Sequence, residues 1–145
     1  MKVTNSYPII ITEKFTQSRA FYKKLGFTPV FDGEWYCQLV WADFPSVQLG
    51  LMKPGHDTQP ELFHAATLGE GSVICLEVED AGVAADEVRD AGFEFALEVR
   101  SEPWGQKHFA LLDPNGVRID VASQNGVVAP EYAQHFLDAT EAALA

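Results

Sequence analysis

Apolar residues in the first half of the chain form short runs interrupted by one helical repeat. Tyr7–Thr12 is a short run rich in β-branched residues, which is typical of a strand. The following segment carries residues at i, i+3, i+4 and i+7, the spacing that lines one face of a helix. These residues are Ser18, Phe21, Tyr22 and Leu25. The pattern therefore predicts a strand followed by a helix.

Residue types indicate where this helix begins and ends. Thr16 is a candidate N-cap, and Gly26 stands where a helix can end on a left-handed residue. Three further apolar segments predict strands, and Asp32-Gly33 predicts a tight turn after the first of them. The segments are Thr28–Phe31, Trp35–Trp41 and Ser46–Met52. The predicted order of the first half is thus β-α-β-β-β.

The second half repeats this order after an irregular connector. Residues 54–71 contain two prolines and three glycines, which favours a loop. Ser72–Val78 then predicts a strand, and Ala84, Val88 and Ala91 share a helix face. Three strands are predicted to follow: Glu94–Val99, Lys107–Leu112 and Val117–Ala122.

The two halves correspond at a nearly constant spacing, which indicates a duplicated unit. One constant shift in numbering relates Thr12, Tyr22, Leu25, Gly26 and Phe27 to Val78, Val88, Ala91, Gly92 and Phe93. After a longer loop a slightly larger shift relates Val47, Leu49 and Leu51 to Val117, Ile119 and Val121. Each unit would have a half-covered sheet that must pack against something.

The last predicted hairpin contains the most distinctive local motifs. Its turn is Asp113-Pro114-Asn115-Gly116, in which Pro114 presets φ and Asn115 or Gly116 can take positive φ. A loop containing Trp104 precedes the hairpin. A large aromatic in such a loop is either a lid on the core or a wall of a ligand pocket.

The repeat and its motifs resemble the vicinal-oxygen-chelate superfamily, which includes glyoxalase I, extradiol dioxygenases, and fosfomycin and bleomycin resistance proteins. The motifs are Ser18, Phe21-Tyr22, Leu25-Gly26-Phe27, Gly92-Phe93, Trp104-Gly105, Phe109, Asp113-Pro114-Asn115-Gly116 and Ile119-Asp120. The resemblance implies an α+β fold in which two tandem β-α-β-β-β modules form an eight-stranded, cup-shaped mixed sheet. Many members of this family dimerise, often completing their cups across subunits.

The resemblance also implies module boundaries within a single domain of residues 1–145. Module 1 would span about residues 3–53, and module 2 about residues 72–124. A C-terminal helix is expected at about residues 129–145, with Pro130 in its first turn and an apolar stripe of Tyr132, Phe136 and Ala143.

Metal-dependent members of the family bind their ion through His, Gln or Glu on the first and last strands of each module. The corresponding positions here are Tyr7, Gly50 (with Gln48 two residues earlier), Val73 and Asp120. This set supplies too few oxygen and nitrogen donors for Zn²⁺, Ni²⁺, Mn²⁺ or Fe²⁺. The four histidines show no i, i+4 ligand spacing either. We therefore expect no metal and no other cofactor, as in the metal-free branch that includes bleomycin resistance proteins.

Composition narrows the classes of partner and location. The 145 residues are 47% apolar with a formal net charge of −11, which disfavours nucleic acid and anionic membranes. No apolar run approaches the roughly 18 residues of a membrane helix, and the N-terminus lacks the apolar region of a signal peptide. A cytoplasmic location is expected, with Cys37 and Cys75 reduced and buried.

The remaining hypothesis is a ligand cup in a homodimer that binds a small molecule. Its candidate ligand-binding residues are Tyr7, Trp35, Trp41, Gln48, Trp104, Phe109 and Asp120. Aromatic walls and negative charge would suit a flat or cationic compound such as an antibiotic. The sequence alone does not decide which face of Trp35–Trp41 points inward. An enzyme that uses a divalent metal or acid–base chemistry by Asp120 with His108, and a structural or regulatory protein, are the alternatives.

Overall fold

The computed structural model describes residues 1–137, and its chain divides into two compact units. Unit 1 comprises Met1–Ser72 and Leu112–Arg118, and unit 2 comprises Val73–Leu111 and Ile119–Ala145. Unit 1 therefore contains the first predicted module, the connector and the Asp113–Gly116 turn. Among residues 1–137, no helix is long and apolar enough to cross a membrane.

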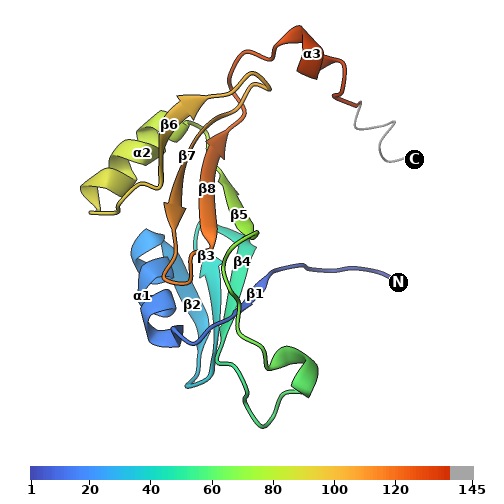
Figure 1. Ribbon diagram of the computed structural model, residues 1–145, viewed down its shortest axis with the longest axis vertical. Coiled ribbons are helices and arrows are strands. Elements are labelled where there is room, and N and C mark those ends of the chain that lie inside the picture. The colour runs from blue at the N-terminus through green and yellow to red at the C-terminus, as the bar shows by residue number, and fades with distance from the viewer. Residues whose placement is uncertain (138–145) are drawn as a thin grey trace. The chain divides into compact units, whose positions relative to one another are not determined.

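Both modules have the predicted β-α-β-β-β order (Figure 1). Module 1 consists of β1 (Ile9–Ile11), α1 (Phe15–Leu25), β2 (Phe27–Asp32), β3 (Tyr36–Trp41) and β4 (Phe44–Met52), followed by a 3-10 helix at Glu61–Phe63. Module 2 consists of β5 (Val73–Glu77), α2 (Ala81–Asp90), β6 (Leu97–Ser101), β7 (Lys107–Leu112) and β8 (Arg118–Ser123), followed by α3 (Pro130–Ala133). The α+β fold class and the duplicated module are thus confirmed.

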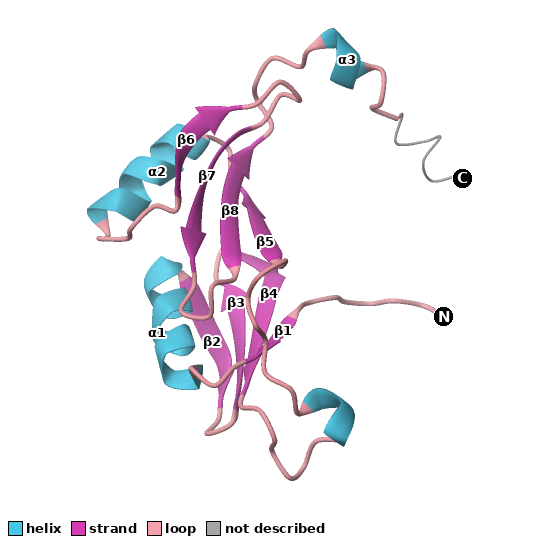
Figure 2. Ribbon diagram, in the orientation of Figure 1, coloured by secondary structure: helices cyan, strands magenta, loops and turns pink. Residues whose placement is uncertain are grey.

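The strands form two four-stranded sheets of equivalent order, β1-β4-β3-β2 and β5-β8-β7-β6 (Figure 2). In the first sheet β1 is parallel to β4, whereas β3 is antiparallel to both β4 and β2. The duplication extends to single hydrogen bonds. The Thr12 amide donates to the Met52 carbonyl, and at the equivalent place in the second module the Val78 amide donates to the Ala122 carbonyl, each at 2.8 Å.

The core of unit 1 lies between α1 and one face of its sheet. Cys37 and Leu39 are fully buried, and Phe27 of β2 contacts both Tyr22 of α1 and Trp41 of β3 through perpendicular rings. Odd-numbered residues of β3 therefore face α1. Tyr36 and Gln38 point to the opposite face, away from α1.

Two local expectations about module 1 need comment. Gly26 ends α1 as predicted, with φ of +136° and its amide bonded to the carbonyls of Tyr22 and Lys23. Thr16 is not the N-cap, because Phe15 is drawn into the core and already belongs to the helix. The N-cap is Lys14, whose backbone amide donates to the Thr12 hydroxyl at 2.8 Å.

The predictions for the two cysteines and for the C-terminal helix are each correct only in part. The burial predicted for both thiols is correct for Cys37 and wrong for Cys75, which is exposed on β5. A helix does begin at Pro130, and α3 ends at Ala133. Residues 138–145 of the predicted C-terminal helix lie outside the described residues.

Candidate functional site

The face of the first sheet that points away from α1 carries an aromatic pocket. Its volume is about 540 Å³, and it is lined by β1, the start of β3, the end of β4 and the 3-10 helix. Six of its wall residues are Tyr7, Ile9, Trp35, Tyr36, Met52 and Phe63. Trp35 stacks on His56 with ring centroids 4.2 Å apart and planes inclined by 16°. The site therefore offers flat apolar surfaces with one polar edge.

A chain of polar side chains continues from this pocket across the same face. The Tyr36 hydroxyl donates to Gln38 Oε1, and Gln38 Nε2 donates to Gln48 Oε1 at 2.9 Å. Gln48 Nε2 in turn donates to the Pro45 carbonyl at 3.0 Å. Burial, with Tyr7 nearby, raises the pKa of Tyr36 to about 12. At neutral pH the Tyr36 phenol is protonated and can donate the hydrogen bond to Gln38.

The position of Gly50 shows why a family-type metal site does not fit here. In the β-sheet register Gly50 is paired with Ile9 on one side and Gln38 on the other. A Cβ at Gly50 would lie 2.8 Å from the Tyr36 hydroxyl oxygen and 2.9 Å from Ile9 Cγ1. The tyrosine thus fills the space that a ligand side chain at this position would need. Among the described residues, no group of three or more His, Cys, Asp or Glu is placed to hold a metal ion.

The β-sheet register also changes which residue of the first strand stands at the position expected for a metal ligand. Ile9, and not Tyr7, is the neighbour of Gly50 on β1, since β1 begins two residues later than predicted. Neither side chain is a metal ligand of the kind the family uses. Tyr7 instead lies at the pocket, 41% exposed.

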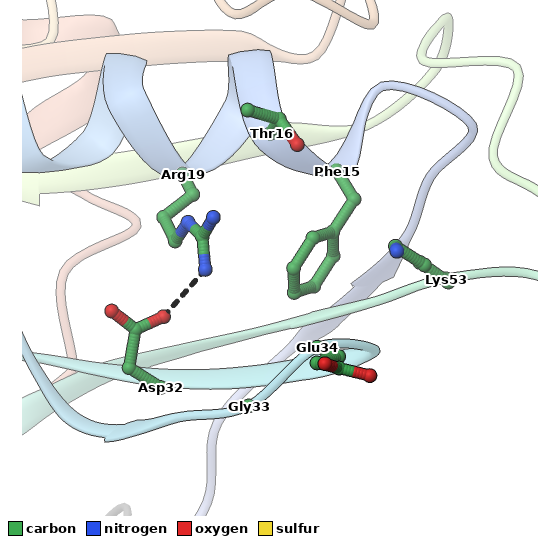
Figure 3. Close-up of a pocket in the computed structure, with 7 residues that line it drawn as sticks. All are labelled: Phe15, Thr16, Arg19, Asp32, Gly33, Glu34 and Lys53. Atoms are coloured by element: carbon green, nitrogen blue, oxygen red, sulfur yellow. Dashed lines mark hydrogen bonds and ion pairs between the residues drawn. The ribbon is translucent and has the colours of Figure 1, made fainter.

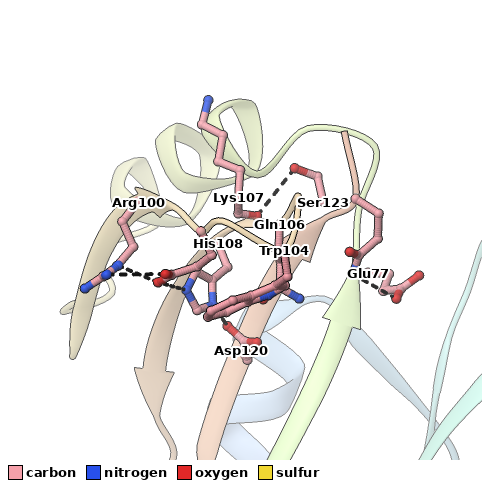
Figure 4. A network of polar contacts seen from close by, with 10 residues as sticks. Glu77, Arg100, Trp104, Gln106, Lys107, His108, Asp120 and Ser123 are labelled. Carbon is pink, nitrogen blue, oxygen red and sulfur yellow. Dashed lines mark hydrogen bonds and ion pairs between the residues drawn. The ribbon is translucent and has the colours of Figure 1, made fainter. Parts of the chain in front are cut away.

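The second sheet presents a charged network instead of an aromatic pocket (Figure 4). His108 of β7 lies between two carboxylates, with Nδ1 2.8 Å from Asp120 Oδ1 and Nε2 3.1 Å from Glu102 Oε1. Arg100 Nε approaches Glu102 Oε1 at 2.5 Å. The hydrogen bond from His108, followed by the charge of Arg100, holds the pKa of Glu102 below its usual value. Each imidazole nitrogen of His108 therefore has one carboxylate oxygen as its hydrogen-bonding partner.

Trp104 lies beside this network, in the loop between β6 and β7. Trp104 is 37% exposed, and its Nε1 donates to Gln106 Oε1 at 3.2 Å. Asp120 uses one carboxylate oxygen for His108 and is partly exposed. Unit 2 therefore brings together two predicted site residues, Trp104 and Asp120.

The predicted site residues thus fall into separate groups. Tyr7 and Trp35 lie at the pocket of unit 1, and Gln48 lies in the polar chain on the same face. Trp41 is on the opposite face, packed on Phe27 and over Gly26. Phe109 is fully buried and stacked on Phe95 at 4.8 Å. Phe109 is therefore a core residue, and Trp41 is a half-buried residue on the α1 face of the first sheet, so neither joins the other predicted residues at the pocket.

Sequence reasoning missed Tyr36 and Gln38, although a usable signal was present. Both alternate with the buried Cys37 and Leu39 on β3, so identifying the face covered by α1 would have placed them on the opposite one. It also missed Glu102 and Arg100, which precede the Trp104 loop. Their partner His108 was considered only as a base acting with Asp120.

A second hollow of about 500 Å³ lies on the α1 side of unit 1 (Figure 3). Phe15 forms its floor, with Arg19 Cζ 5.3 Å and Lys53 Nζ 5.5 Å from the ring centroid. Arg19 also pairs with Asp32 at 2.7 Å. Arg19 and Lys53 therefore have contacts within the hollow itself, and their presence is explained by local packing.

Comparison with known proteins places this geometry in context. The family model described as "Glyoxalase/Bleomycin resistance protein/Dioxygenase superfamily" matches residues 6–121. No curated protein sequence matches the chain significantly.

Several solved structures have the same fold at low sequence identity. A bleomycin-binding protein complexed with bleomycin is 20% identical with a TM-score of 0.61, covering 83% of this chain and 98% of its own. A bleomycin resistance determinant encoded on the transposon Tn5 is 22% identical with a TM-score of 0.62, covering 85% and 98%. A glyoxalase/bleomycin resistance protein/dioxygenase from Nocardioides is 19% identical with a TM-score of 0.72, covering 90% and 89%.

Proposed function

This chain belongs to the glyoxalase/bleomycin resistance protein/dioxygenase superfamily, and from that premise we propose that it is a metal-free protein that binds and sequesters a small molecule. The compound would be flat and aromatic or cationic, as an antibiotic of the bleomycin type is. Binding would take place in the cytoplasm and without a chemical step. A homodimer would be the active form.

The single observation that carries the proposal is the aromatic pocket of unit 1 with Tyr36 over Gly50. Tyr7, Trp35 and Phe63 line the pocket with aromatic rings, one face of Trp35 being stacked on His56, and the Tyr36–Gln38–Gln48 chain offers polar groups at its edge. A pocket with apolar walls and a few oriented polar groups is typical of small-molecule sites. The same tyrosine occupies the space of a metal-ligand side chain, which favours binding over metal-dependent catalysis.

Charge supports a cationic ligand. The chain has a net charge of −11, and an acidic protein raises the local concentration of cations and speeds their association. Aromatic faces add cation–π attraction of about 0.5–2 kcal/mol. The structural relative that was solved with bleomycin makes that antibiotic the natural first probe.

The acid–base alternative receives less support from the geometry. Both ring nitrogens of His108 are engaged by carboxylates, one by Asp120 and one by Glu102. A base needs a free nitrogen within reach of the substrate proton. His108 would have to break one of these contacts before it could accept a proton.

Calorimetric titration with metal-free bleomycin tests the proposal directly. We expect saturable binding that Trp35→Ala weakens at least tenfold, because the variant removes a stacking surface of the pocket. Trp41→Phe is the matched control, since Trp41 lies on the α1 face and should leave affinity unchanged. Binding of one Zn²⁺, Ni²⁺, Mn²⁺ or Fe²⁺ per chain, with turnover of a glyoxalase or dioxygenase substrate, would overturn the proposal.

Light scattering after gel filtration tests the dimer. Large apolar side chains are exposed on strands of both sheets, among them Ile9, Phe31 and Val73. Covering such residues is the usual reason for self-association. A mass of two chains at micromolar concentration is expected, and a single-chain mass across that range would contradict the dimer.

A further inference from the structure

The chain returns to the Trp104 loop after β8 and pairs with it. The Gly126 amide donates to the Gly105 carbonyl at 2.8 Å, and the Ala129 amide donates to the Pro103 carbonyl at 2.7 Å. Between these bonds Trp104 and Val128 form an antiparallel bridge. We call Gly126–Tyr132 the strap. Three successive backbone contacts therefore fix the strap on the loop that carries Trp104.

Two glycines allow this close approach. Gly105 has φ of +90°, and a Cβ there would lie 2.5 Å from Val128 Cγ2. A Cβ at Gly126 would lie 2.7 Å from the Gly105 carbonyl oxygen. Both distances are shorter than real Cβ contacts, so any side chain at either position would push the strap away from the loop.

The strap ends by placing Tyr132 beside Trp104. The two ring centroids are 5.8 Å apart with an interplanar angle of 64°, an edge-to-face arrangement. Tyr132 is 36% exposed and Trp104 37% exposed, so neither residue is buried in the core. The indole Nε1 also donates a hydrogen bond to Gln106 Oε1 at 3.2 Å. Trp104 thus has two side-chain contacts, with Tyr132 and with Gln106, and part of its surface stays exposed.

The same loop also carries the charged network. The amide of Glu102 donates to the Gln106 carbonyl at 2.7 Å, and the Gly105 amide donates to the Glu102 carbonyl at 3.1 Å. Glu102 then contacts His108 and Arg100 through its side chain. Fixing the loop therefore also fixes the carboxylate that faces His108.

The strap lies outside the residues that the family model matches. The family match ends at residue 121, whereas the strap begins at Gly126. The family match therefore does not include the strap or its contacts with Trp104.

We propose that the strap is a positioning element for Trp104, and that Tyr132 and Trp104 together form a two-ring subsite for a flat ring of the ligand. The ligand half of this proposal rests on the proposed binding function, and the positioning half does not. Tyr132 would then help to set which compounds this chain accepts.

The positioning half is tested without any ligand. Protein labelled with 5-fluorotryptophan gives one ¹⁹F resonance for each of the three tryptophans, and Trp104→Phe assigns that of Trp104. Gly126→Ala should shift or broaden the Trp104 resonance and leave those of Trp35 and Trp41 in place. The matched control is Val127→Ala, because Val127 is 90% exposed in the same strap. An unchanged Trp104 resonance in Gly126→Ala would overturn the positioning role.

The ligand half is tested by titrating the full chain with metal-free bleomycin. Tyr132→Ala should lower affinity about three- to tenfold, the range expected for one aromatic contact, and Tyr132→Phe should restore it. Equal affinity in Tyr132→Ala and the unaltered chain would overturn the subsite. If the unaltered chain does not bind bleomycin at all, the proposed function and its subsite fail for this compound, and the ¹⁹F result alone decides the positioning role.

Discussion

The two modules share one backbone pattern, but the side chains of α1 and α2 differ in polarity. In unit 1, α1 meets the Asp113–Gly116 turn through buried polar groups: Tyr22 donates to Asp113 Oδ2 at 2.8 Å, and Asn115 Nδ2 donates to the Ser18 hydroxyl at 3.0 Å. Thr12 donates to Asn115 Oδ1 in the same network. The equivalents of Thr12, Ser18 and Tyr22 in the second module are Val78, Ala84 and Val88, which carry no polar side-chain atoms.

This difference shows how a duplicated fold can become asymmetric. Thr12 and Ser18 are fully buried, and Tyr22 and Asp113 nearly so. Buried polar groups need hydrogen-bonding partners. Here the polar groups of α1 and of the preceding loop bond to those of the Asp113–Gly116 turn. The network therefore fixes the turn before β8 against α1, whereas the second module has only apolar packing at the equivalent positions.

The largest effect is expected from Asp113→Ala, which removes the hub of this network. Asp113 accepts bonds from Tyr22, from the amides of Asn115 and Val117, and from Asn115 Nδ2. Leaving several buried donors unpaired should cost about 3 kcal/mol or more of unfolding free energy, measured by urea denaturation. Asp43→Ala is the control at the equivalent, exposed position of the first module, and should stay within about 0.5 kcal/mol. Equal losses in the two variants would mean that the asymmetry has no energetic basis.

A smaller effect is expected from Tyr22→Phe, with a defined pH dependence. Removing the hydroxyl should cost about 1–2 kcal/mol at neutral pH. Burial, reinforced by the charge of Asp113, raises the pKa of Tyr22 above its unfolded value of 10. Folding therefore favours the protonated phenol, so this contribution is fully present below pH 10 and is lost as the pH rises further.

Denaturation of both proteins between pH 8 and pH 11 measures this dependence. The unaltered chain should lose stability above pH 10 more steeply than Tyr22→Phe, by up to about 1.4 kcal/mol per pH unit. Cys37, whose pKa burial raises to about 11, titrates in both proteins and cancels in the difference. Parallel curves would show that Tyr22 ionises as easily in the fold as in the unfolded chain.

Asp80→Ala removes a side-chain cap that the helix of the second module has and the helix of the first module lacks. The Asp80 side chain caps α2 by accepting from the amides of Gly82 and Val83 at 2.7 and 3.2 Å. The N-cap of α1, Lys14, makes no such side-chain bond. The variant should lower the melting temperature less than Asp113→Ala does, and Asp80→Asn should recover most of the loss. A drop larger than that of Asp113→Ala would reverse the ranking of the two modules.

The smallest effect is expected from Glu102→Gln in the charged network of unit 2. Because the folded-state pKa of Glu102 lies below its usual 4.5, its contribution is present above that pH and is lost as the pH falls. The variant should therefore match the unaltered chain at low pH and be slightly less stable at pH 7 in thermal melts. A variant that is more stable than the unaltered chain at pH 7 would mean that the Glu102 carboxylate destabilises the folded state.

The sequence itself determined the order of elements, and the structure confirms it. Hydrophobic periodicity fixed where the helices and strands lie, because those patterns depend only on local spacing. The matching shifts in numbering between the two halves predicted the duplication, which reappears in the paired bonds of Thr12 and Val78. Glycine at position 26 predicted the end of α1, since a left-handed residue is required there.

The composition of the site was decided only by the tertiary structure. Trp41 and Phe109 have the residue types of ligand contacts, but strand alternation buries Phe109 completely and directs Trp41 to the α1 face, against Phe27. Tyr36 became part of the site because Gly50 leaves room for it on a neighbouring strand. Tyr132 reached Trp104 through a backbone pairing between segments far apart in the sequence. Periodicity specifies which side chains alternate along a strand, whereas long-range pairing decides which face is covered and which side chains meet.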